Sequence, residues 1–230
     1  MCGRYAAARE AGEVADWFEV EQLPVTELPR RYNVTPTSEA YIVVDDDGVR
    51  ALQIARWGLI PSWSKDATRA SRMINARSES VAEKPAFRAA FRRRRCLVPA
   101  DGYYEWQAPE IGGVKQPFFI HRSDGGQLAF AGLFEDWVGP HGPVRSFCVL
   151  TQDAVPSLST IHDRMPVIVQ PDAWQRWIDP NSPGVPALLE DVQVESSMGL
   201  QAYPVSTQVN RPGNDDPTLI APVGPVSLVG

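Results

Sequence analysis

The sequence predicts an α+β fold in which a single domain, residues 1–230, is built on an antiparallel, barrel-like β-sheet core with short peripheral helices. Strand-like runs outnumber helical ones and are separated by turn signals, which is typical of antiparallel sheet. The strands do not alternate regularly with helices, as a doubly wound parallel sheet would require. No repeat, low-complexity segment or long linker divides the chain, and 43% of its residues are hydrophobic, enough for one core.

The helical segments are few and short. Residues 10–20 carry apolar side chains at helical spacing. The residues that share this face are Val14, Trp17 and Phe18. Residues 78–94 also have a helical pattern, but Pro85 interrupts it because proline lacks the N–H that a helix needs. Two further short helices are predicted over residues 172–178 and 186–192.

Strand-like runs fill most of the rest. Residues 41–44 and 49–55 flank the turn Asp45–Gly48 and predict a β-hairpin. Later apolar runs predict strands over 96–99, 103–106, 117–121, 128–134, 147–151 and 165–169. Turns that contain aspartate and glycine separate some of these strands.

The charge distribution limits how nucleic acid could bind. A net charge of −6 argues against binding over the whole surface, but a single-stranded site needs only one positive face. Arginines gather in the middle of the sequence, at Arg69, Arg72, Arg77, Arg88 and Arg92–Arg95. Taken alone, the run Arg92–Arg95 predicts a solvated helix end rather than a binding site.

The composition argues against several classes of protein. Three cysteines without a C-x-x-C pair predict neither a disulfide framework nor a structural zinc site. Cys96 and Cys148 lie in apolar runs and are predicted to be core residues. No apolar run reaches the roughly 20 residues of a membrane helix, and the N-terminus has no secretory signal. We therefore expect a cytoplasmic monomer with no membrane association, no bound metal and no small-molecule cofactor.

Cys2 is the most unusual residue of the sequence. Methionine is normally removed when the second residue is small, which would leave a cysteine with both a thiol and a free α-amine. Their reference pKa values are about 8.5 and about 7.7–8.0, so both groups are partly nucleophilic near neutral pH. The amine can form a Schiff base with an aldehyde, and the thiol can then close a thiazolidine ring. The alternative is an incidental cysteine near a mobile terminus.

Glu105 and His162 are candidates for proton transfer. Glu105 lies between Tyr104 and Trp106, where an apolar pocket would raise the carboxyl pKa and make it a general acid. Strand alternation equally permits an exposed glutamate at this position. His162 lies in a polar turn beside Asp163, where a histidine can shuttle protons near pH 7 or simply hydrogen-bond to the backbone.

Two further segments suit contacts with nucleic acid. Asn75 and Arg77 are two residues apart, so in an extended segment both point to one side, where an amide and a guanidinium suit a sugar-phosphate. A helix N-cap at Ser78 is compatible with this interpretation. Trp63 lies among polar residues and is expected to be exposed for stacking on an unpaired base, whereas Trp57 is expected in the core.

Seven blocks of the sequence resemble the SOS response-associated peptidase family, also called SRAP proteins. The blocks are residues 1–5, 31–37, 57–63, 74–79, 95–106, 116–120 and 161–166. They occur in family order from the N-terminus to Pro166, which is far more specific than any one block. The connection formed by residues 64–72 matches no family block.

The resemblance implies a single SRAP-like α+β domain that forms a DNA–protein crosslink at abasic sites in single-stranded DNA. It implies Cys2 as the nucleophile and Glu105 as the acid that opens the sugar ring. Asn75 would help to hold the terminal amine, and His162 would assist proton transfer. The implied contacts to DNA or to the pocket come from Arg4, Asn33, Pro36, Trp63, Arg77 and Arg164. The family name implies a peptidase that removes its own Met1, and the implied role places the protein on damaged DNA in the nucleoid.

Two other functions remain open at this point. A thiol peptidase would use Cys2 as nucleophile and His162 as base. A non-catalytic reader of modified DNA bases would use Trp63 and Arg77 and would not need Cys2. The mass of the mature protein separates the two functions that use Cys2, the crosslink and the thiol peptidase, from the non-catalytic reader. Both functions that use Cys2 require the loss of Met1.

Overall fold

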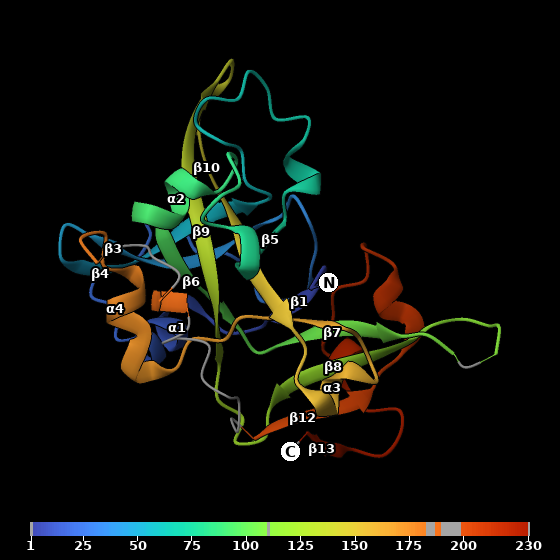
Figure 1. The fold of residues 1–230 in the computed structure, drawn as a ribbon. Helices are drawn as coiled ribbons and strands as arrows, with labels where there is room; N and C mark the ends of the chain where they lie inside the picture. Colours follow the sequence, from blue (N-terminus) through green and yellow to red (C-terminus); the bar gives the residue numbers. More distant parts are fainter. Residues whose placement is uncertain (1, 110, 183–186, 190–198, 230) are drawn as a thin grey trace.

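The computed structural model describes residues 2–109, 111–182, 187–189 and 199–229, in which two β-sheets are surrounded by short helices (Figure 1). The predicted α+β class is confirmed, because strands dominate and the longest described helix has only eight residues. Within these residues, no helix is long and apolar enough to cross a membrane.

A five-stranded barrel forms the core of the fold. In the order in which they pair around it, its strands are β10 (Gly142–Asp153), β4 (Val49–Trp57), β3 (Glu39–Asp46), β6 (Arg95–Ala100) and β9 (Leu128–Gly139). The long hairpin of β9 and β10 closes the ring, from Gly142 opposite Gly139 to Val149 opposite Gly132. The predicted barrel-like core and the predicted hairpin of β3 and β4 are therefore confirmed.

The barrel is not antiparallel throughout, which corrects the prediction. β10 runs parallel to β4, with Ser146 opposite Arg56 and Phe147 opposite Trp57. The other neighbouring strands of the ring pair antiparallel. Parallel neighbours need a long crossover connection rather than a tight turn. Here the connection contains β6, β9 and part of the second sheet.

A six-stranded antiparallel sheet packs against the barrel. From edge to edge its strands are β13 (Ser227–Val229), β12 (Leu200–Pro204), β8 (Gln116–Arg122), β7 (Gly102–Gln107), β1 (Tyr5–Ala7) and β2 (Arg31–Val34). One face shares a hydrophobic core with the barrel, in which Tyr5 and Tyr103 meet Trp57, Phe130 and Phe147. Strands β6 to β10 include all the runs predicted between residues 96 and 151, whereas β1, β2, β12 and β13 were not predicted.

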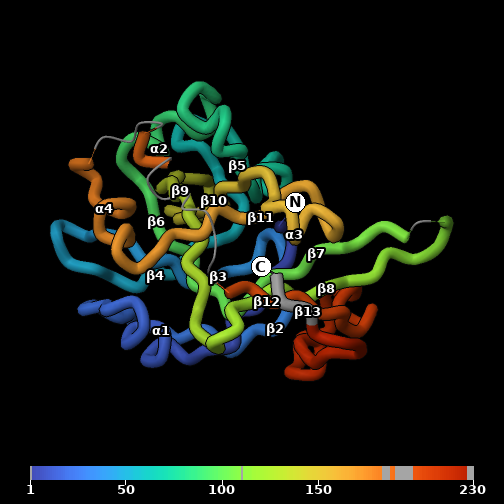
Figure 2. Tube along the Cα trace, turned by 60° about the horizontal axis from the view of Figure 1, so that its bottom comes forward, coloured from blue at the N-terminus to red at the C-terminus, as the bar shows by residue number. Residues whose placement is uncertain are grey.

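The C-terminal part of the chain covers the opposite face of this sheet. Tyr104, Phe119 and Tyr203 pack there against Val209 and Leu219. The last two residues belong to the 3-10 helices η4 (Thr207–Asn210) and η5 (Pro217–Ile220). Figure 2 shows this red segment beside β8. The six-stranded sheet therefore lies between the barrel and the C-terminal cover.

β10 extends beyond the barrel, and its second half carries two further strands. β5 (Asn75–Arg77) runs parallel to residues 149–151, and β11 (Arg164–Pro166) runs antiparallel to residues 151–153. Because both strands pair with Thr151, they lie on opposite edges of β10. β11 is the only part of the strand predicted over 165–169 that forms within the described chain. The candidate site is assembled around this end of β10.

The first helix begins and ends close to where the sequence predicts. α1 (Ala11–Phe18) starts with a capping box between Glu10 and Glu13, which satisfies N–H groups of the first turn. It ends at Glu19, whose left-handed φ of 54° stops the helix. Val14 and Phe18 are buried as predicted, whereas Trp17 is 38% exposed.

The other predicted helices are confirmed in part. α4 (Trp174–Ile178) matches the helix predicted over 172–178. The prediction over 78–94 is largely wrong, because only η2 (Ser78–Ser80) and α2 (Arg88–Arg93) are helical and Pro85 lies between them. Ser78 is the first residue of η2 rather than its cap. The helix predicted over 186–192 lies mainly outside the described residues. The remaining short helices are η1 (Ala70–Arg72), α3 (Pro156–Ser159) and η3 (Pro171–Ala173).

Arg95 corrects the prediction of a solvated helix end. Its side chain is 1% exposed and lies over the ring of Trp177, 5.8 Å from the ring centre. The guanidinium donates hydrogen bonds to the backbone carbonyls of Phe91, Arg92, Trp177, Asp179 and Ser182. Burial lowers the pKa of Arg95 to about 10, against the charge of Asp179, which raises it. Arg95 thus ties α2 to α4. The neighbouring Cys96, and Cys148, are buried as predicted.

Candidate active site

Four predicted residues reach one site from four separate elements. Cys2 precedes β1, Asn75 begins β5, Glu105 lies in β7, and His162 lies between α3 and β11. β1 pairs with β7, with Tyr5 opposite Tyr103, which brings the start of the chain beside the strand of Glu105. The turn after α3 reaches the end of β7, because the Gln107 side chain donates a 3.0 Å hydrogen bond to the Thr160 carbonyl. Figure 2 shows α3 beside β7.

Cys2 and Asn75 are joined directly. The Asn75 side-chain amide donates a hydrogen bond of 2.8 Å to the Cys2 carbonyl oxygen. The Oδ1 atom of Asn75 is buried and has no partner among the described residues. Cys2 is 0% exposed. Burial raises the pKa of its thiol far above the usual range, the charge of Glu105 raises it further, and the backbone N–H of Arg4 acts in the opposite direction.

Glu105 occupies the buried environment that the sequence left as one of two alternatives. Glu105 is 2% exposed. It shares one face of β7 with Tyr103, and this face points toward the barrel. Burial raises the pKa of the Glu105 carboxyl to about 7, and the charge of Asp163 adds to the rise. The carboxyl is therefore divided between its acid and base forms near neutral pH.

His162 lies next to Glu105, and groups on the opposite side of its ring orient it. Its Nε2 atom is 3.9 Å from a carboxylate oxygen of Glu105. Its Nδ1 atom accepts a 2.9 Å hydrogen bond from the Arg164 N–H and lies 2.8 Å from the Asp163 carboxylate. Burial lowers the pKa of His162, while Asp163 acts to raise it. The side chain is 29% exposed, so the pair meets solvent on the histidine side.

Arg164 is held by two carboxylates. Its guanidinium pairs with Glu79 at 2.6 Å and with Asp153 at 2.5 Å, and it also donates to the Thr151 carbonyl. Only 11% of the side chain is exposed. The contact of Arg164 with DNA stays a prediction, whereas its backbone N–H already orients His162.

Arg4 and Asn33 fasten the C-terminal cover to the six-stranded sheet. Arg4 donates to the Asn33 Oδ1 atom at 2.9 Å and to the Val209 carbonyl at 2.7 Å. Asn33 is 0% exposed, and its amide also donates to the carbonyls of Arg211 and Asn214. Because Asn33 has no exposed surface, these bonds favour a structural role, and its contact with DNA stays a prediction.

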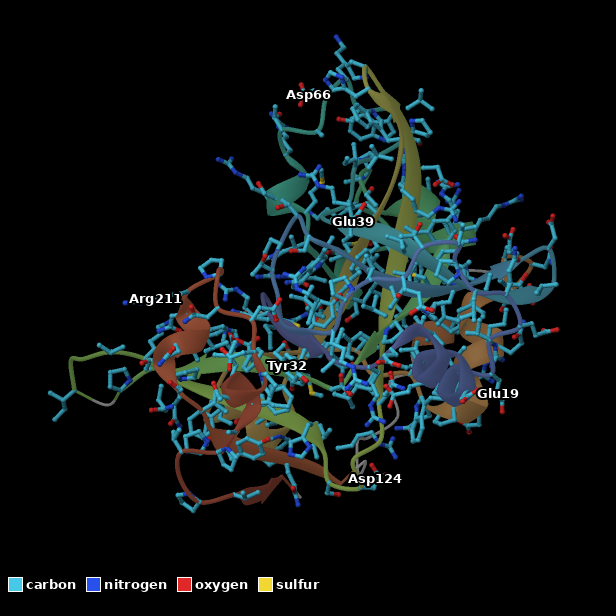
Figure 3. All side chains as sticks on the ribbon, turned by 180° about the vertical axis from the view of Figure 1, so that it is seen from behind. Glu19, Tyr32, Glu39, Asp66, Asp124 and Arg211 are labelled. Carbon is cyan, nitrogen blue, oxygen red and sulfur yellow. The ribbon has the colours of Figure 1, made fainter. Side chains whose placement is uncertain are left out.

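Trp63 and Arg77 are exposed, as a surface for DNA would require. Trp63 is 68% exposed and lines a hollow of about 430 Å³ together with Lys65, Arg69 and Met73. The loop that also carries Asp66 projects at one end of the molecule (Figure 3). Arg77 ends β5, two residues after Asn75, and is exposed. Pro36 is partly exposed in the turn after β2. None of these three predicted residues contacts the four residues of the site through a bond within the described chain.

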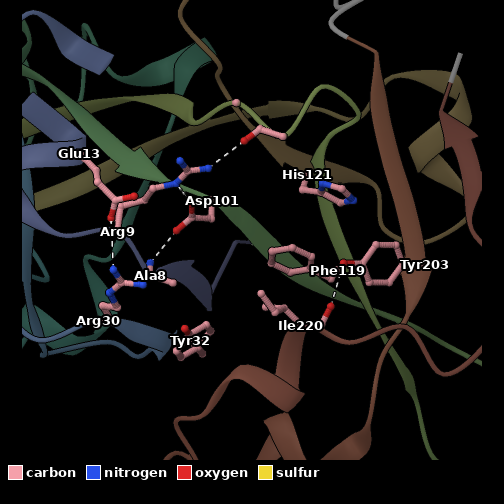
Figure 4. Close-up of a pocket in the computed structure, with 12 residues that line it drawn as sticks. Ala8, Arg9, Glu13, Arg30, Tyr32, Asp101, Phe119, His121, Tyr203 and Ile220 are labelled. Atoms are coloured by element: carbon pink, nitrogen blue, oxygen red, sulfur yellow. Dashed lines mark hydrogen bonds and ion pairs between the residues drawn. The ribbon is translucent and has the colours of Figure 1, made fainter. Parts of the chain in front are cut away.

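A second hollow, of about 380 Å³, lies on the other face of the six-stranded sheet (Figure 4). Phe119, His121 and Tyr203 line one side of it. The charged groups around it are paired with each other: Arg9 bonds to Asp101 at 2.9 Å, and Arg30 lies 3.5 Å from Glu13. None of the predicted site residues lines this hollow.

Sequence reasoning missed two residues beside Cys2. Tyr5 and Tyr103 are buried in the same hydrophobic core as Cys2. Each lies in a block that was already singled out, but their aromatic character suggested packing alone. Their position on paired strands became visible only when β1 was found beside β7. Among the residues that the structure describes, no group of three or more histidine, cysteine, aspartate or glutamate residues could hold a metal ion.

Comparison with known proteins places this arrangement in a family. The profile of "SOS response associated peptidase (SRAP)" matches residues 1–212. The abasic site processing protein YoqW of Bacillus subtilis is 36% identical over 222 residues, covering 96% of this chain and 99% of that protein. The abasic site processing protein HMCES of Gallus gallus is 32% identical over 225 residues, covering 84% of this chain and 66% of that protein.

Solved structures share the fold. A protein from Bacteroides thetaiotaomicron superimposes with a TM-score of 0.83 at 25% identity, covering 96% of this chain and all of that one. A phage-related protein from Bordetella bronchiseptica gives a TM-score of 0.69 at 30% identity, covering 89% and 94%. By the extent of the profile match and the identity to proteins aligned over nearly its whole length, the chain belongs to the SOS response associated peptidase (SRAP) family.

Proposed function

We propose that this protein processes abasic sites in single-stranded DNA by forming a covalent crosslink through Cys2, after Met1 has been removed. The relatives named abasic site processing proteins support the substrate. The observation that carries the proposal is the meeting of the Cys2 backbone, held by Asn75, with a buried glutamate whose pKa is raised to about 7. A nucleophile and an acid close enough for the charge of Glu105 to act on the Cys2 thiol match the two needs of an abasic sugar.

The acid acts first, because an abasic sugar is mostly a closed ring and only its open form has an aldehyde. Protonated Glu105 donates its proton to the ring oxygen as the ring C–O bond breaks, and the anomeric hydroxyl loses its proton to water as it becomes the aldehyde. At a pKa of about 7, a large fraction of Glu105 carries this proton at neutral pH. General acid–base assistance of this kind is typically worth about 10²–10⁴-fold in rate.

The amine of Cys2 then attacks the aldehyde. The hydrogen bond from Asn75 to the Cys2 carbonyl fixes the backbone that carries this amine. The buried Oδ1 atom of Asn75, which lacks a partner among the described residues, suits an N–H of the processed terminus. Water leaves as the Schiff base forms, and His162, beside Glu105, can relay protons to solvent.

The thiol of Cys2 completes the reaction. It adds to the Schiff base and forms a thiazolidine ring, which prevents the strand cleavage that an amine alone would promote by β-elimination. Removal of Met1 is required at the outset, because an internal cysteine has no free amine. We include self-removal of Met1 as the peptidase step that the family description names.

Exposed residues of β5 and of the loop before it suit a single strand of DNA. Arg77, two residues from Asn75, can contact a phosphate next to the lesion. Trp63 offers a ring for stacking, with Lys65 and Arg69 beside it. Pro36, Arg4 and Arg164 are partly exposed and complete the predicted DNA contacts, whereas Asn33, which is buried, supports the Arg4 side chain.

The decisive experiment tests Cys2 against another buried cysteine. Purified protein, shown by intact mass to lack Met1, is incubated with a single-stranded oligonucleotide that contains one abasic site. We expect a heat-stable adduct from the wild type and from Cys148→Ala, and none from Cys2→Ala. An equal yield from Cys2→Ala, or full activity of protein that retains Met1, contradicts the proposal.

A further inference from the structure

Two buried tyrosines in the site have hydroxyl groups without a partner. Tyr5 and Tyr103 lie opposite each other on β1 and β7 and are 0% and 1% exposed. Neither hydroxyl has a hydrogen-bond partner within the described chain. A hydroxyl buried in this way destabilises the fold relative to a phenylalanine of the same shape. Such groups in a native protein call for a reason beyond packing.

Packing alone does not require these hydroxyls. The rings of Tyr5 and Tyr103 both meet Phe130 edge to face, with ring centres 6.0 and 5.9 Å away. Tyr5 also meets Trp57 at 5.1 Å. Phenylalanine would make the same ring contacts. Tyr104, the next residue on β7, differs because its hydroxyl donates a 2.7 Å hydrogen bond to the Tyr32 carbonyl.

Both tyrosines lie close to the reacting groups. Tyr5 is three residues from Cys2, and Tyr103 shares a face of β7 with Glu105. Both tyrosines belong to the core cluster that contains Cys2. After burial itself, the Cys2 thiol has the largest effect on the pKa of each phenol, and it raises both.

We propose that Tyr5 and Tyr103 are positioning residues for the thiol step, in which their hydroxyls donate hydrogen bonds to the Cys2 sulfur as it closes the thiazolidine ring. This assignment rests on the proposed function of Cys2. A neutral thiol is a weak acceptor, whereas sulfur that is losing its proton is a strong one. Donors that have no partner while the thiol is neutral therefore become bonded during the reaction.

The chemistry of this step balances within the site. The sulfur loses its proton to the Glu105 carboxylate and forms a bond to the former aldehyde carbon. The π electrons of the C=N bond move to nitrogen, which receives the proton from Glu105. Negative charge exists on sulfur only between these two transfers, and that charge is what the hydroxyls stabilise.

Other donors do not fill this need. Burial and the charge of Glu105 both oppose ionisation of the Cys2 thiol, and the positive N-terminus and the Arg4 N–H offset them only in part. The side-chain amide of Asn75 is already bonded to the Cys2 carbonyl. The phenol groups are buried donors that remain available in the core cluster that contains Cys2.

The test separates the amine step from the thiol step. Wild type, Tyr5→Phe, Tyr103→Phe and the double variant, all lacking Met1, are mixed with abasic single-stranded DNA. Borohydride traps the Schiff base and reports the amine step, whereas heat-stable adduct formed without borohydride reports ring closure. Tyr104→Phe is the matched control, because it removes a hydroxyl that is already bonded, on the other face of the same strand.

We expect Tyr5→Phe and Tyr103→Phe to form the Schiff base at the wild-type rate and to close the ring about tenfold to a hundredfold more slowly, as loss of a hydrogen bond to a charged atom predicts. Their melting temperatures should equal or exceed that of the wild type. Tyr104→Phe should close the ring normally and melt at a lower temperature. Alkylation of Cys2, followed in the N-terminal peptide against pH, should shift to higher pH in the first two variants only.

Each alternative outcome has a separate meaning. Unchanged ring closure in the double variant overturns the role of the tyrosines and leaves the proposed function intact. Equal slowing of both steps also overturns it, because the hydroxyls would then act before the thiol. Absence of any adduct from the wild type overturns the proposed function itself.

Discussion

Two buried polar clusters in this protein differ in how completely their groups are bonded. Around Arg95, a wholly buried guanidinium donates to five backbone carbonyls and joins two helices to the barrel. Around Cys2, Tyr5 and Tyr103 have hydroxyls without partners among the described residues, and Asn75 has one such oxygen. Both clusters lie against the same barrel, and the residue at the centre of each, Arg95 or Cys2, is buried.

The difference separates structure from chemistry. A buried polar group that is fully bonded stabilises one arrangement of the chain and has nothing left to offer a ligand. A buried polar group without a partner costs stability and is retained where a reaction will use it. On this basis we assign the Arg95 cluster to the stability of the fold and propose the Cys2 cluster as the reaction site, so variants of each should behave in opposite ways.

The largest effect is expected at Arg95. Arg95→Leu leaves five carbonyls without their donor and should lower the free energy of unfolding by about 3–5 kcal/mol. For a chain of this size that is a fall in melting temperature of roughly 10 °C. Arg93→Leu, which changes an exposed arginine at the end of α2, should have little effect. Crosslinking by the fraction of Arg95→Leu that remains folded should be normal. A loss of crosslinking larger than the loss of folded protein would contradict a purely structural role for Arg95.

Substitution of Glu105 should have the opposite effect, raising stability and reducing crosslinking. Its pKa in the folded protein, about 7, lies above the usual 4.5, so the folded state favours the protonated form and loses stability as pH rises between these values. At 1.36 kcal/mol per pKa unit, the cost above pH 7 is about 3 kcal/mol. Glu105→Gln should therefore be more stable than the wild type at pH 8, with no such gain near pH 4, while crosslinking falls about 10²–10⁴-fold. Denaturant unfolding at the two pH values measures this, and lower stability at pH 8 would show that the carboxylate is a structural group.

The rate of crosslinking should have a bell-shaped dependence on pH. The reactive form needs a neutral amine, with a reference pKa of about 7.7–8.0, and a protonated Glu105, with a pKa of about 7. The rate should rise about tenfold per pH unit below pH 7, peak between the two values, and fall about tenfold per unit above pH 8. Glu105→Gln should lose the alkaline fall and keep the acid rise. If the alkaline fall persists in this variant, another group is the acid.

Asn75 has features of both clusters and should show the smallest change in stability. Asn75→Ala removes one hydrogen bond, to the Cys2 carbonyl, and should cost about 1 kcal/mol of stability. Crosslinking should fall by a larger factor, because the terminal amine is no longer held. Asn75→Asp keeps the shape and replaces the donor by a carboxylate, so it should not restore the rate. Normal crosslinking by Asn75→Ala would show that Asn75 has a structural role only.

Much of the barrel could be predicted from the sequence, because alternation and turn signals are local. The hairpin around Asp45–Gly48 and the helix of residues 11–18 formed as expected. The parallel pairing of β10 with β4 and β5 could not be predicted, because side chains alternate in the same way in both strand directions. The short strands at residues 5–7 and 31–34 were also missed, since three or four residues carry too little pattern.

The residues of the candidate site were named from the sequence and their roles stay predictions, whereas the geometry that brings them together came from the structure. Resemblance named Cys2, Asn75, Glu105 and His162, while their order in the chain gave no sign of which would touch. Whether Glu105 faced water or core was undecided until the face of β7 was known. The burial of Arg95 was hidden because a run of arginines looks the same whether its last member is exposed or enclosed by distant carbonyls.

The far end of β10 also determines when the pocket can exist during synthesis. Cys2, Asn75 and Glu105 leave the ribosome before β10 does, and β11 follows only at residues 164–166. An aminopeptidase that works on nascent chains thus meets Met1 while the pocket has not formed, whereas self-removal has to wait for nearly three quarters of the protein to be translated. The timing of methionine loss on stalled nascent chains of different lengths would distinguish these two routes.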